Sequence, residues 1–258
     1  MTTILEASGL TKSYGRRTAL DHASISVLPG EFVVVLGASG SGKTTLFRCL
    51  TRLTEPDRGE IFIAGQPMHA LKGRHLAAAR SNIGVVFQQF NLVRRLSALD
   101  NVLAGRLRGT PLWRVMLGQF ATADIDRAVE ALDAVGLGDH IQQRADTLSG
   151  GQQQRVAIAH ALVQDARIIL ADEPVASLDP QTAISILSVL HGLTRSHGLG
   201  VLCTLHQPGL AAQFADRTLT MRAGRILPPE ETTQHLADGS ATAESEGANK
   251  ALTSTAGL

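Results

Sequence analysis

Cysteine, aromatic residues and long apolar runs are all scarce in this sequence. Of its 258 residues, two are cysteine, one is tryptophan and one is tyrosine. The two cysteines stand among apolar or helix-forming neighbours, which favours buried reduced thiols over a disulfide framework or a cysteine metal site. The longest apolar runs, such as 32–36 and 168–171, are far too short to cross a bilayer. These absences argue against a disulfide-stabilised domain and against a membrane-spanning chain.

Charge of neither sign dominates the sequence. Lysine and arginine number 24 and aspartate and glutamate 23, which gives a net charge of +1. A chain without a broad basic field is not expected to bind nucleic acid. The N-terminus, MTTILEASGL, has no basic region followed by an apolar run, so no signal peptide is expected. We therefore expect a soluble intracellular chain that reaches a membrane only through a partner.

Short apolar segments separated by turns predict an α/β fold. Alternating or β-branched runs predict strands at 4–10, 19–27, 32–36, 61–64, 83–87, 167–171, 201–205 and 218–221. Helices are expected from Lys43 and after Pro180, and the chain reads as helical from the strand at 83–87 to about Gln164, with breaks at glycine-containing turns. The pattern predicts one domain over 1–227 with a helical insertion. From 228 to 258 the periodicity is lost, which predicts a disordered tail.

A glycine-rich loop follows the most apolar predicted strand and opens a predicted helix. Its sequence, GASGSGKTT, fits G-x-x-x-x-G-K-[ST] in the strand–loop–helix context that a phosphate-binding loop requires. Glycines let backbone N–H groups close around phosphate oxygens. We expect Lys43 to reach the β- and γ-phosphates and the Thr44 hydroxyl to ligate Mg²⁺. The nucleotide-binding residues predicted from this loop are Gly37, Ala38, Ser39, Gly40, Ser41, Gly42, Lys43, Thr44 and Thr45.

Two carboxylates end another apolar predicted strand, in RIILADEP. Carboxylates at the tip of a buried strand are costly unless something pairs with them, and in a P-loop protein Mg²⁺ and its water do so. We expect Asp172 to lie on the metal side and Glu173 to polarise the attacking water. The two motifs together predict a nucleoside triphosphatase. ATPase and GTPase both remain open from these motifs, although no N-K-x-D-like guanine signature is present.

A second glycine-rich turn stands at 148–152 and is followed by a helix-compatible run. Such a turn at a helix start is also suited to binding an anion. Its sequence, LSGGQQQR, resembles the signature of ATP-binding cassette proteins, and the resemblance covers about residues 4–226. The other family motifs occur in order, with Tyr14 in TKSYG, Gln88 in VVFQQF, SLDP at 177–180 and His206 in TLHQ. The resemblance implies a P-loop NTPase (RecA-like) core with an antiparallel β subdomain and an inserted α-helical subdomain at about 89–165.

The family resemblance also implies that two chains share each ATP site. Two copies would pack head to tail about a two-fold axis, so that the signature turn of one closes on the γ-phosphate held by the P-loop of the other. The residues expected to bind nucleotide in this way are Ser149, Gly150, Gly151 and Gln152. Asp179 is expected to communicate across the dimer and Tyr14 to stack on adenine.

The resemblance assigns roles to the remaining motif residues. Gln88 would sense the metal and its water, and His206 would contact the γ-phosphate. The expected catalytic residues are Lys43, Gln88, Glu173 and His206. The expected Mg²⁺-side residues are Thr44, Gln88 and Asp172.

A longer match narrows the resemblance. The stretch VVFQQFNLVRRLSALDNVLAGRLRGTPLWR, residues 85–114, is similar to the helical insertion of phosphonate importer ATP-binding proteins. This implies an ATP-hydrolysing importer subunit, peripheral on the cytoplasmic face of the inner membrane, with two permease subunits and an extracytoplasmic phosphonate-binding protein as partners. Two alternatives remain: a non-transport cassette ATPase that regulates or assembles another complex, and a transporter ATPase for a different solute.

Within this insertion, residues 107–120 hold more apolar side chains than a short helix needs for one packed stripe. Core packing inside the helical subdomain is one interpretation. The other is a docking surface for a cytoplasmic helix of a permease, next to Gln88. The sequence leaves both open.

Overall fold

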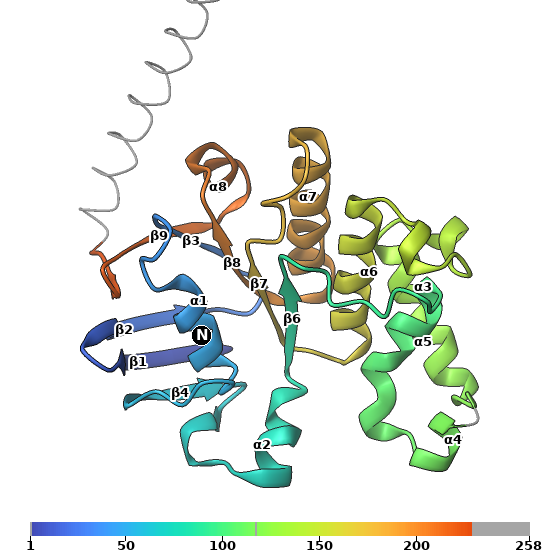
Figure 1. Cartoon of the computed structure of the whole chain (residues 1–258), viewed down its shortest axis with the longest axis horizontal. Coiled ribbons are helices and arrows are strands. Elements are labelled where there is room, and N and C mark those ends of the chain that lie inside the picture. Colours follow the sequence, from blue (N-terminus) through green and yellow to red (C-terminus); the bar gives the residue numbers. More distant parts are fainter. Residues whose placement is uncertain (1, 117, 229–258) are drawn as a thin grey trace, which may run out of the picture.

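The computed structural model describes residues 2–116 and 118–228, and its strands form two sheets (Figure 1). The first is antiparallel, in the order β2-β1-β4-β5, with bounds β1 Leu5–Tyr14, β2 Arg17–Val27, β4 Arg58–Ile63 and β5 Gln66–Pro67. The second has the order β10-β9-β3-β8-β7-β6, with bounds β3 Phe32–Leu36, β6 Ile83–Phe87, β7 Ile168–Asp172, β8 Gly200–Leu205, β9 Arg217–Arg222 and β10 Arg225–Ile226. Its strands are parallel except at the β9–β10 pair.

Helices cover the second sheet and form a group of their own between β6 and β7. The α-helices are α1 Lys43–Leu50, α2 Gly73–Arg80, α3 Ala98–Leu103, α4 Leu112–Met116, α5 Thr122–Ala134, α6 Gly150–Val163, α7 Pro180–His197 and α8 Pro208–Phe214. Short 3₁₀ helices are η1 Met68–Ala70, η2 Ala104–Gly109, η3 Gly138–His140 and η4 Ala145–Thr147. Figure 1 shows α3 to α6 gathered on one side of the large sheet. Among the described residues, no helix combines the length and apolar character needed to cross a bilayer.

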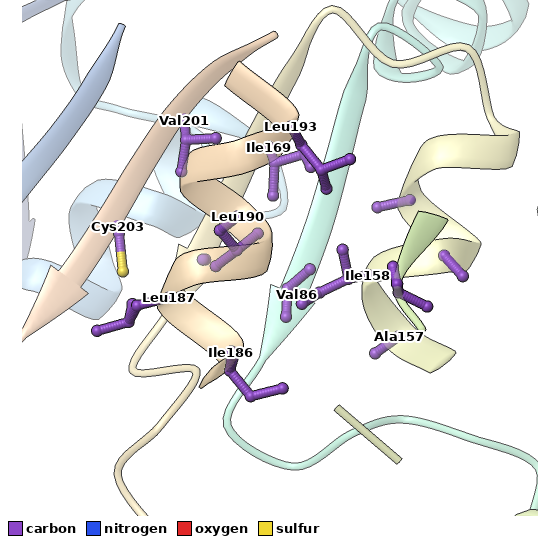
Figure 2. Close-up of a cluster of buried hydrophobic side chains, with 14 of the residues drawn as sticks. Val86, Ala157, Ile158, Ile169, Ile186, Leu187, Leu190, Leu193, Val201 and Cys203 are labelled. Atoms are coloured by element: carbon purple, nitrogen blue, oxygen red, sulfur yellow. The ribbon is translucent and has the colours of Figure 1, made fainter. Parts of the chain in front are cut away.

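The central strand β3 explains why the large sheet is buried on both faces. All five of its residues are buried, and successive side chains point to opposite faces. Phe32, Val34 and Leu36 join the core cluster under α6 and α7, whereas Val33 and Val35 join the cluster under α1 and the small sheet. Figure 2 shows the first of these clusters, in which Leu187 and Leu190 of α7 lie close to residues of neighbouring strands. Strands covered on both sides are the mark of a parallel sheet between layers.

The strand arrangement brings distant motifs to one edge of the sheet. The strands β3, β8 and β7 are adjacent and parallel, so their carboxyl ends meet. The P-loop follows β3, His206 follows β8, and Asp172 and Glu173 stand at the end of β7. Ligands of open α/β sheets bind at this edge. The predicted fold class, an α/β P-loop core with an antiparallel β subdomain and an inserted helical subdomain, is confirmed.

Several local predictions differ from the structure. The strand predicted at 4–10 continues to Tyr14, because its partner β2 extends to Arg17 and the two close a hairpin. Residues 88–97, predicted to be helical, contain no helix, and α3 begins only after Ser97 caps it by accepting a hydrogen bond from the Asp100 N–H. The sequence pattern does not predict the helices α2 and α8. Most of the predicted tail, 229–258, lies outside the described residues.

Candidate functional site

The P-loop is held tightly against strand β2. Gly42, the residue before α1, has φ 115°, and a Cβ placed there would lie 2.5 Å from the carbonyl oxygen of Ala19. Any larger residue would push the loop off the strand. The small sheet is thus in direct backbone contact with the loop that we expect to hold phosphate.

Lys43, the first residue of α1, is buried inside this loop. Its Nζ donates to the carbonyl oxygen of Gly37 at 2.7 Å and to that of Ala38 at 3.2 Å. Burial lowers the pKa of Lys43, and the nearby carboxylates of Glu173 and Asp172 oppose that shift. A buried cation whose hydrogen bonds go only to neutral carbonyl groups is suited to an anion.

A hollow of about 420 Å³ lies beside the loop. Its lining residues are Tyr14, Arg17, Ala19, Ser39, Gly40, Gly42, Lys43, Thr44, Thr45 and Glu173. Most of the predicted nucleotide-binding residues of the loop are therefore brought together. Gly37, Ala38 and Ser41 of the predicted set are not among the lining residues. Arg17 and Ala19 line the hollow but were not predicted to.

The two carboxylates after β7 occupy different environments. The Thr204 hydroxyl donates to Asp172 Oδ1 at 2.9 Å, while the N–H of Glu173 donates to the same hydroxyl at 2.8 Å. Burial raises the pKa of Asp172, and the Thr204 hydrogen bond works in the opposite direction. Glu173 has φ 50°, a left-handed conformation that is strained for this residue. Thr204 thus fixes both residues at the strand end.

The side chain of Glu173 points at two cationic or titratable groups. Its Oε1 lies 2.5 Å from Nε2 of His206 and 3.8 Å from Nζ of Lys43. Three of the four predicted catalytic residues therefore meet around one carboxylate oxygen. Gln88, the fourth, does not line the same hollow.

Gln88 lies in a neighbouring hollow with the other residues predicted to face Mg²⁺. This second hollow, of about 390 Å³, has Thr44, Gln88 and Asp172 in its lining. A hydroxyl, an amide and a carboxylate are oxygen donors of the kind that Mg²⁺ accepts, and Mg²⁺ usually takes only one or two carboxylates plus phosphate and water. The donor set fits that ion. Within the described residues no cluster of three or more His, Cys, Asp and Glu side chains suits a metal ion.

The signature turn forms the start of α6. Ser149 caps the helix: its Oγ accepts from the Gln152 N–H at 3.3 Å, and its own N–H donates to Gln152 Oε1 at 2.9 Å. The Gln152 amide nitrogen also lies 3.1 Å from Nε2 of His140. The Ser149 hydroxyl can still donate a hydrogen bond to another acceptor, whereas the Gln152 side chain is already hydrogen-bonded within the chain. Figure 1 shows α6 well separated from α1, and no signature residue lines either hollow.

The signature helix is pressed against α7. A Cβ placed at Gly151 would lie 2.4 Å from Cγ2 of Thr182. The backbone N–H of the same Thr182 donates to Oδ1 of Asp179, the N-cap of α7, at 3.0 Å. Hydrogen bonds to Thr182 lower the pKa of Asp179. The absence of a side chain at Gly151 is therefore explained within one chain, by helix packing.

Tyr14 stands at the end of the β1–β2 hairpin with its ring 48% exposed. Lys12 holds its Nζ 5.7 Å from the ring centroid and 2.7 Å from Oδ1 of Asp57. Asp57 Oδ2 also accepts from the N–H of Ser13 at 2.7 Å. The ion pair and the backbone bond fix the hairpin tip, so the tyrosine ring is held at the edge of the P-loop hollow.

Within residues 107–120, Arg108 places this part of the helical insertion beside the start of β6, not beside Gln88. Arg108 donates to the carbonyl oxygen of Ala78 at 2.9 Å and to the Ser81 hydroxyl at 2.7 Å, and Ser81 precedes β6 whereas Gln88 follows it. The expected placement next to Gln88 is thus wrong. Leu107 and Trp113 are exposed, at 42% and 56%, while Phe120 packs against the core. The segment is therefore only partly used for packing.

Comparison with known proteins supports the reading of these motifs. Residues 20–176 match the family described as ABC transporter. Hypophosphite import ATP-binding protein HtxD of Stutzerimonas stutzeri is 49% identical over 223 residues, which are 86% of this chain and 65% of that protein. Phosphonates import ATP-binding protein PhnC 2 of Rhodopseudomonas palustris (strain BisB18) is 47% identical over 237 residues, which are 91% of this chain and 88% of that protein. The chain thus spans slightly under two thirds of the hypophosphite relative.

Solved structures agree with the sequence relatives. A dimeric post-hydrolysis state of an ATP-binding cassette with bound ADP and phosphate has a TM-score of 0.75 at 34% identity, covering 87% of this chain and 97% of that one. The ADP conformation of another cassette from an ABC transporter has a TM-score of 0.79 at 26% identity, covering 92% and 96%. With its P-loop, its strand-end carboxylates and its signature helix, the chain belongs to the ABC transporter family, as one of its ATP-hydrolysing cassettes.

Proposed function

We propose that this chain drives the import of phosphonate, or of a related phosphorus oxyanion such as hypophosphite, through separate membrane subunits. The observation that carries the proposal is its identity of 47–49% with two import ATP-binding proteins named for these solutes, over 86–91% of the chain. Both solutes are small phosphorus oxyanions. The ATPase supplies the energy and does not itself recognise the solute.

In this proposal the P-loop binds the triphosphate of ATP. The loop amides between Ser39 and Thr45 bind phosphate oxygens, helped by the start of α1. Lys43 exchanges its hydrogen bonds to the Gly37 and Ala38 carbonyl groups for bonds to phosphate, which gives this buried cation an anionic partner in direct contact. Tyr14 offers its exposed face to the adenine ring. The hollow of about 420 Å³ that joins these groups supports this assignment.

The hydrolytic residues act at the carboxyl ends of β7 and β8. Glu173 accepts a proton from the attacking water, and His206, 2.5 Å from it, orients that carboxylate and reaches the γ-phosphate. Thr44, Asp172 and Gln88 would hold Mg²⁺, which when bound neutralises charge on the phosphates. Thr204 positions both carboxylates through its hydroxyl group.

Two copies of the chain are proposed to complete each ATP site. Dimeric cassettes are among its structural relatives. The Ser149 hydroxyl and the N–H groups at the start of α6 line neither hollow beside their own P-loop and would bind the partner's γ-phosphate, as a helix N-terminus does. Asp179, exposed at the start of α7, would lie at the same interface. The nucleotide-binding domain is proposed to span 1–227, with the helical subdomain at about 89–165.

The membrane partners follow from the proposed transport. The chain would sit on the cytoplasmic face of the inner membrane, bound to two permease subunits, with an extracytoplasmic phosphonate-binding protein as an indirect partner. Its helical group between β6 and β7 presents Leu107 and Trp113 to the outside and is the proposed contact region.

Uptake of labelled phosphonate, hypophosphite and phosphate by a strain lacking this gene tests the function. The wild-type gene should restore uptake of one of the first two solutes, and Lys43→Ala should not, because it removes the phosphate contact. Restored phosphate uptake alone, or no solute restored although the protein is made and bound to its permease, would contradict the proposed solute class.

A further inference from the structure

Arg17 is a cation of the nucleotide hollow for which neither the motifs nor the comparisons provide a role. It opens β2 and pairs directly with Tyr14 across the hairpin. Side chains directly opposite each other in an antiparallel pair stand on the same face, about 5 Å apart. Both residues line the same hollow. A base stacked on Tyr14 therefore has Arg17 beside it.

The Arg17 guanidinium also reaches the P-loop. A Cβ placed at Gly40 would lie 3.5 Å from Nη2 of Arg17. Two residues further along β2, Ala19 touches the loop at Gly42. Because this backbone contact fixes β2 against the loop, the position of Arg17 over Gly40 is set by the fold and not by a free hairpin. The guanidinium thus lies beside the P-loop at Gly40, in the hollow that Tyr14 also lines.

Within the part of the chain that the structure describes, the Arg17 guanidinium has no ion-pair partner. Among the described residues, no carboxylate lies within ion-pair distance of its guanidinium and none forms a hydrogen bond with that group, whereas Lys12 on the neighbouring strand is paired with Asp57 at 2.7 Å. An arginine has five donors in a planar fork that matches two oxygens of a phosphate. Its position beside a phosphate loop makes phosphate the ligand that this charge fits.

We propose that Arg17 binds a phosphate group of the bound nucleotide, from outside the P-loop, and so ties the small antiparallel sheet to the triphosphate. The proposal rests on the nucleotide site proposed above. Lys43 and the loop amides hold the phosphates from the side of the large sheet. Arg17 holds them from the side of the hairpin, so that base and phosphate are both contacted by β1 and β2. Because a nucleoside has no phosphate to make this contact, Arg17 also favours the binding of nucleotides over nucleosides.

Nucleotide affinity measured on the purified chain tests this role, by displacement of a fluorescent ADP analogue. Arg17→Ala should lower the affinity for ADP and for ATP about tenfold, which is the effect expected from losing a charge-assisted hydrogen bond that is partly exposed to water. Adenosine, measured at millimolar concentration, should bind equally to both proteins because it has no phosphate. Arg17→Lys should fall between, since it keeps the charge but loses the fork.

The sequence provides a matched control in the neighbouring residue. Arg16→Ala removes the same charge from the turn, but Arg16 does not line the hollow, so its ADP affinity should equal that of the wild type. Equal ADP affinity of Arg17→Ala and the wild type would overturn the inference, as would an equal loss for Arg16→Ala, which would show a diffuse charge effect. A loss for adenosine as large as for ADP would instead place Arg17 on the base or ribose. If the wild type binds no ADP, the proposed function itself fails and this inference with it.

Discussion

Replacing Gly151 by alanine tests why the signature turn contains this glycine. The added methyl group would lie 2.4 Å from Cγ2 of Thr182, where about 4 Å is the ordinary separation of carbon atoms. Overpacking of this kind costs about 1–3 kcal/mol. For a chain of this size each kcal/mol lowers Tm by about 2–4 °C. We therefore expect Tm to fall by about 2–12 °C.

A second substitution should relieve the clash without touching the helix cap. Thr182→Ser removes Cγ2, and the other Thr182 atoms near the new methyl lie at 3.8 and 3.9 Å, which are ordinary contacts. Asp179 is bonded to the backbone N–H of residue 182, so the cap of α7 stays intact. The double variant should regain most of the lost Tm, while Thr182→Ser alone should change it little.

The test is a double-mutant cycle of four proteins: the wild type, Gly151→Ala, Thr182→Ser and the double variant. Differential scanning fluorimetry gives the Tm of each, and an ATPase assay gives its activity. Because the methyl group points at α7 and not outward, the double variant should also regain ATPase activity. A Tm that is not restored would show that the Thr182 contact does not account for the glycine. A variant that is stable but inactive would show that Gly151 must lack a side chain because of the partner's phosphate.

Substitutions at three further positions test the proposed roles. Glu173→Gln keeps the shape but removes the base, so turnover should fall about 10²–10⁴-fold while an ATP-bound dimer accumulates in gel filtration with MgATP. Ser149→Asp keeps a good helix cap but sets a carboxylate against the partner's γ-phosphate, so ATP-driven dimerisation and hydrolysis should fall, whereas Ser149→Asn, which caps equally well, should do less harm. Trp113→Ala should leave the subunit folded and active, because the ring is 56% exposed, but should weaken its co-purification with the membrane subunits.

Each of these predictions has an outcome that contradicts it. Unchanged turnover in Glu173→Gln would mean that another group activates the water. Equal activities of the two Ser149 variants would show that no anion approaches the start of α6. Unfolding of the Trp113→Ala subunit, or normal assembly and transport with it, would remove the docking role of the 107–120 segment.

The elements that sequence predicts best here are those whose signal is local. Residues 32–36 form a continuous apolar run, and the glycine loop behind it is typical of a helix start, so β3 is predicted at its true bounds and α1 at its true first residue. The carboxylates at the end of β7 are likewise recognised by their strand-end position, whereas His206 is recognised only through the resemblance to the cassette family. Parallel pairing of β3, β8 and β7 then brings these motifs together. Only the order of the strands in the sheet shows that they meet.

Features that depend on contacts between distant segments could not be read from the sequence. The closeness of Thr182 to Gly151 depends on how α6 and α7 cross, and the approach of Arg17 to Gly40 depends on how the small sheet meets the large one. The position of 107–120 beside Ser81 is set by hydrogen bonds of Arg108 to residues almost thirty positions away. Periodicity shows which side chains are apolar, but not which neighbour covers them.

The helix α6 packs against β6 and α7, and its length has a mechanical consequence. Ile158, in its second half, is packed in one cluster with Val86 of β6 (Figure 2), while Ser149 caps its N-terminal end. The two positions are nine residues apart, or about 13 Å along the axis. A tilt of about 10° at Ile158 therefore carries Ser149 sideways by about 2 Å, which is enough to make or break a hydrogen bond. Because Gly151 is packed against Thr182 of α7, such a tilt would move the start of α7 with it, so that Ser149 and Asp179 would shift together.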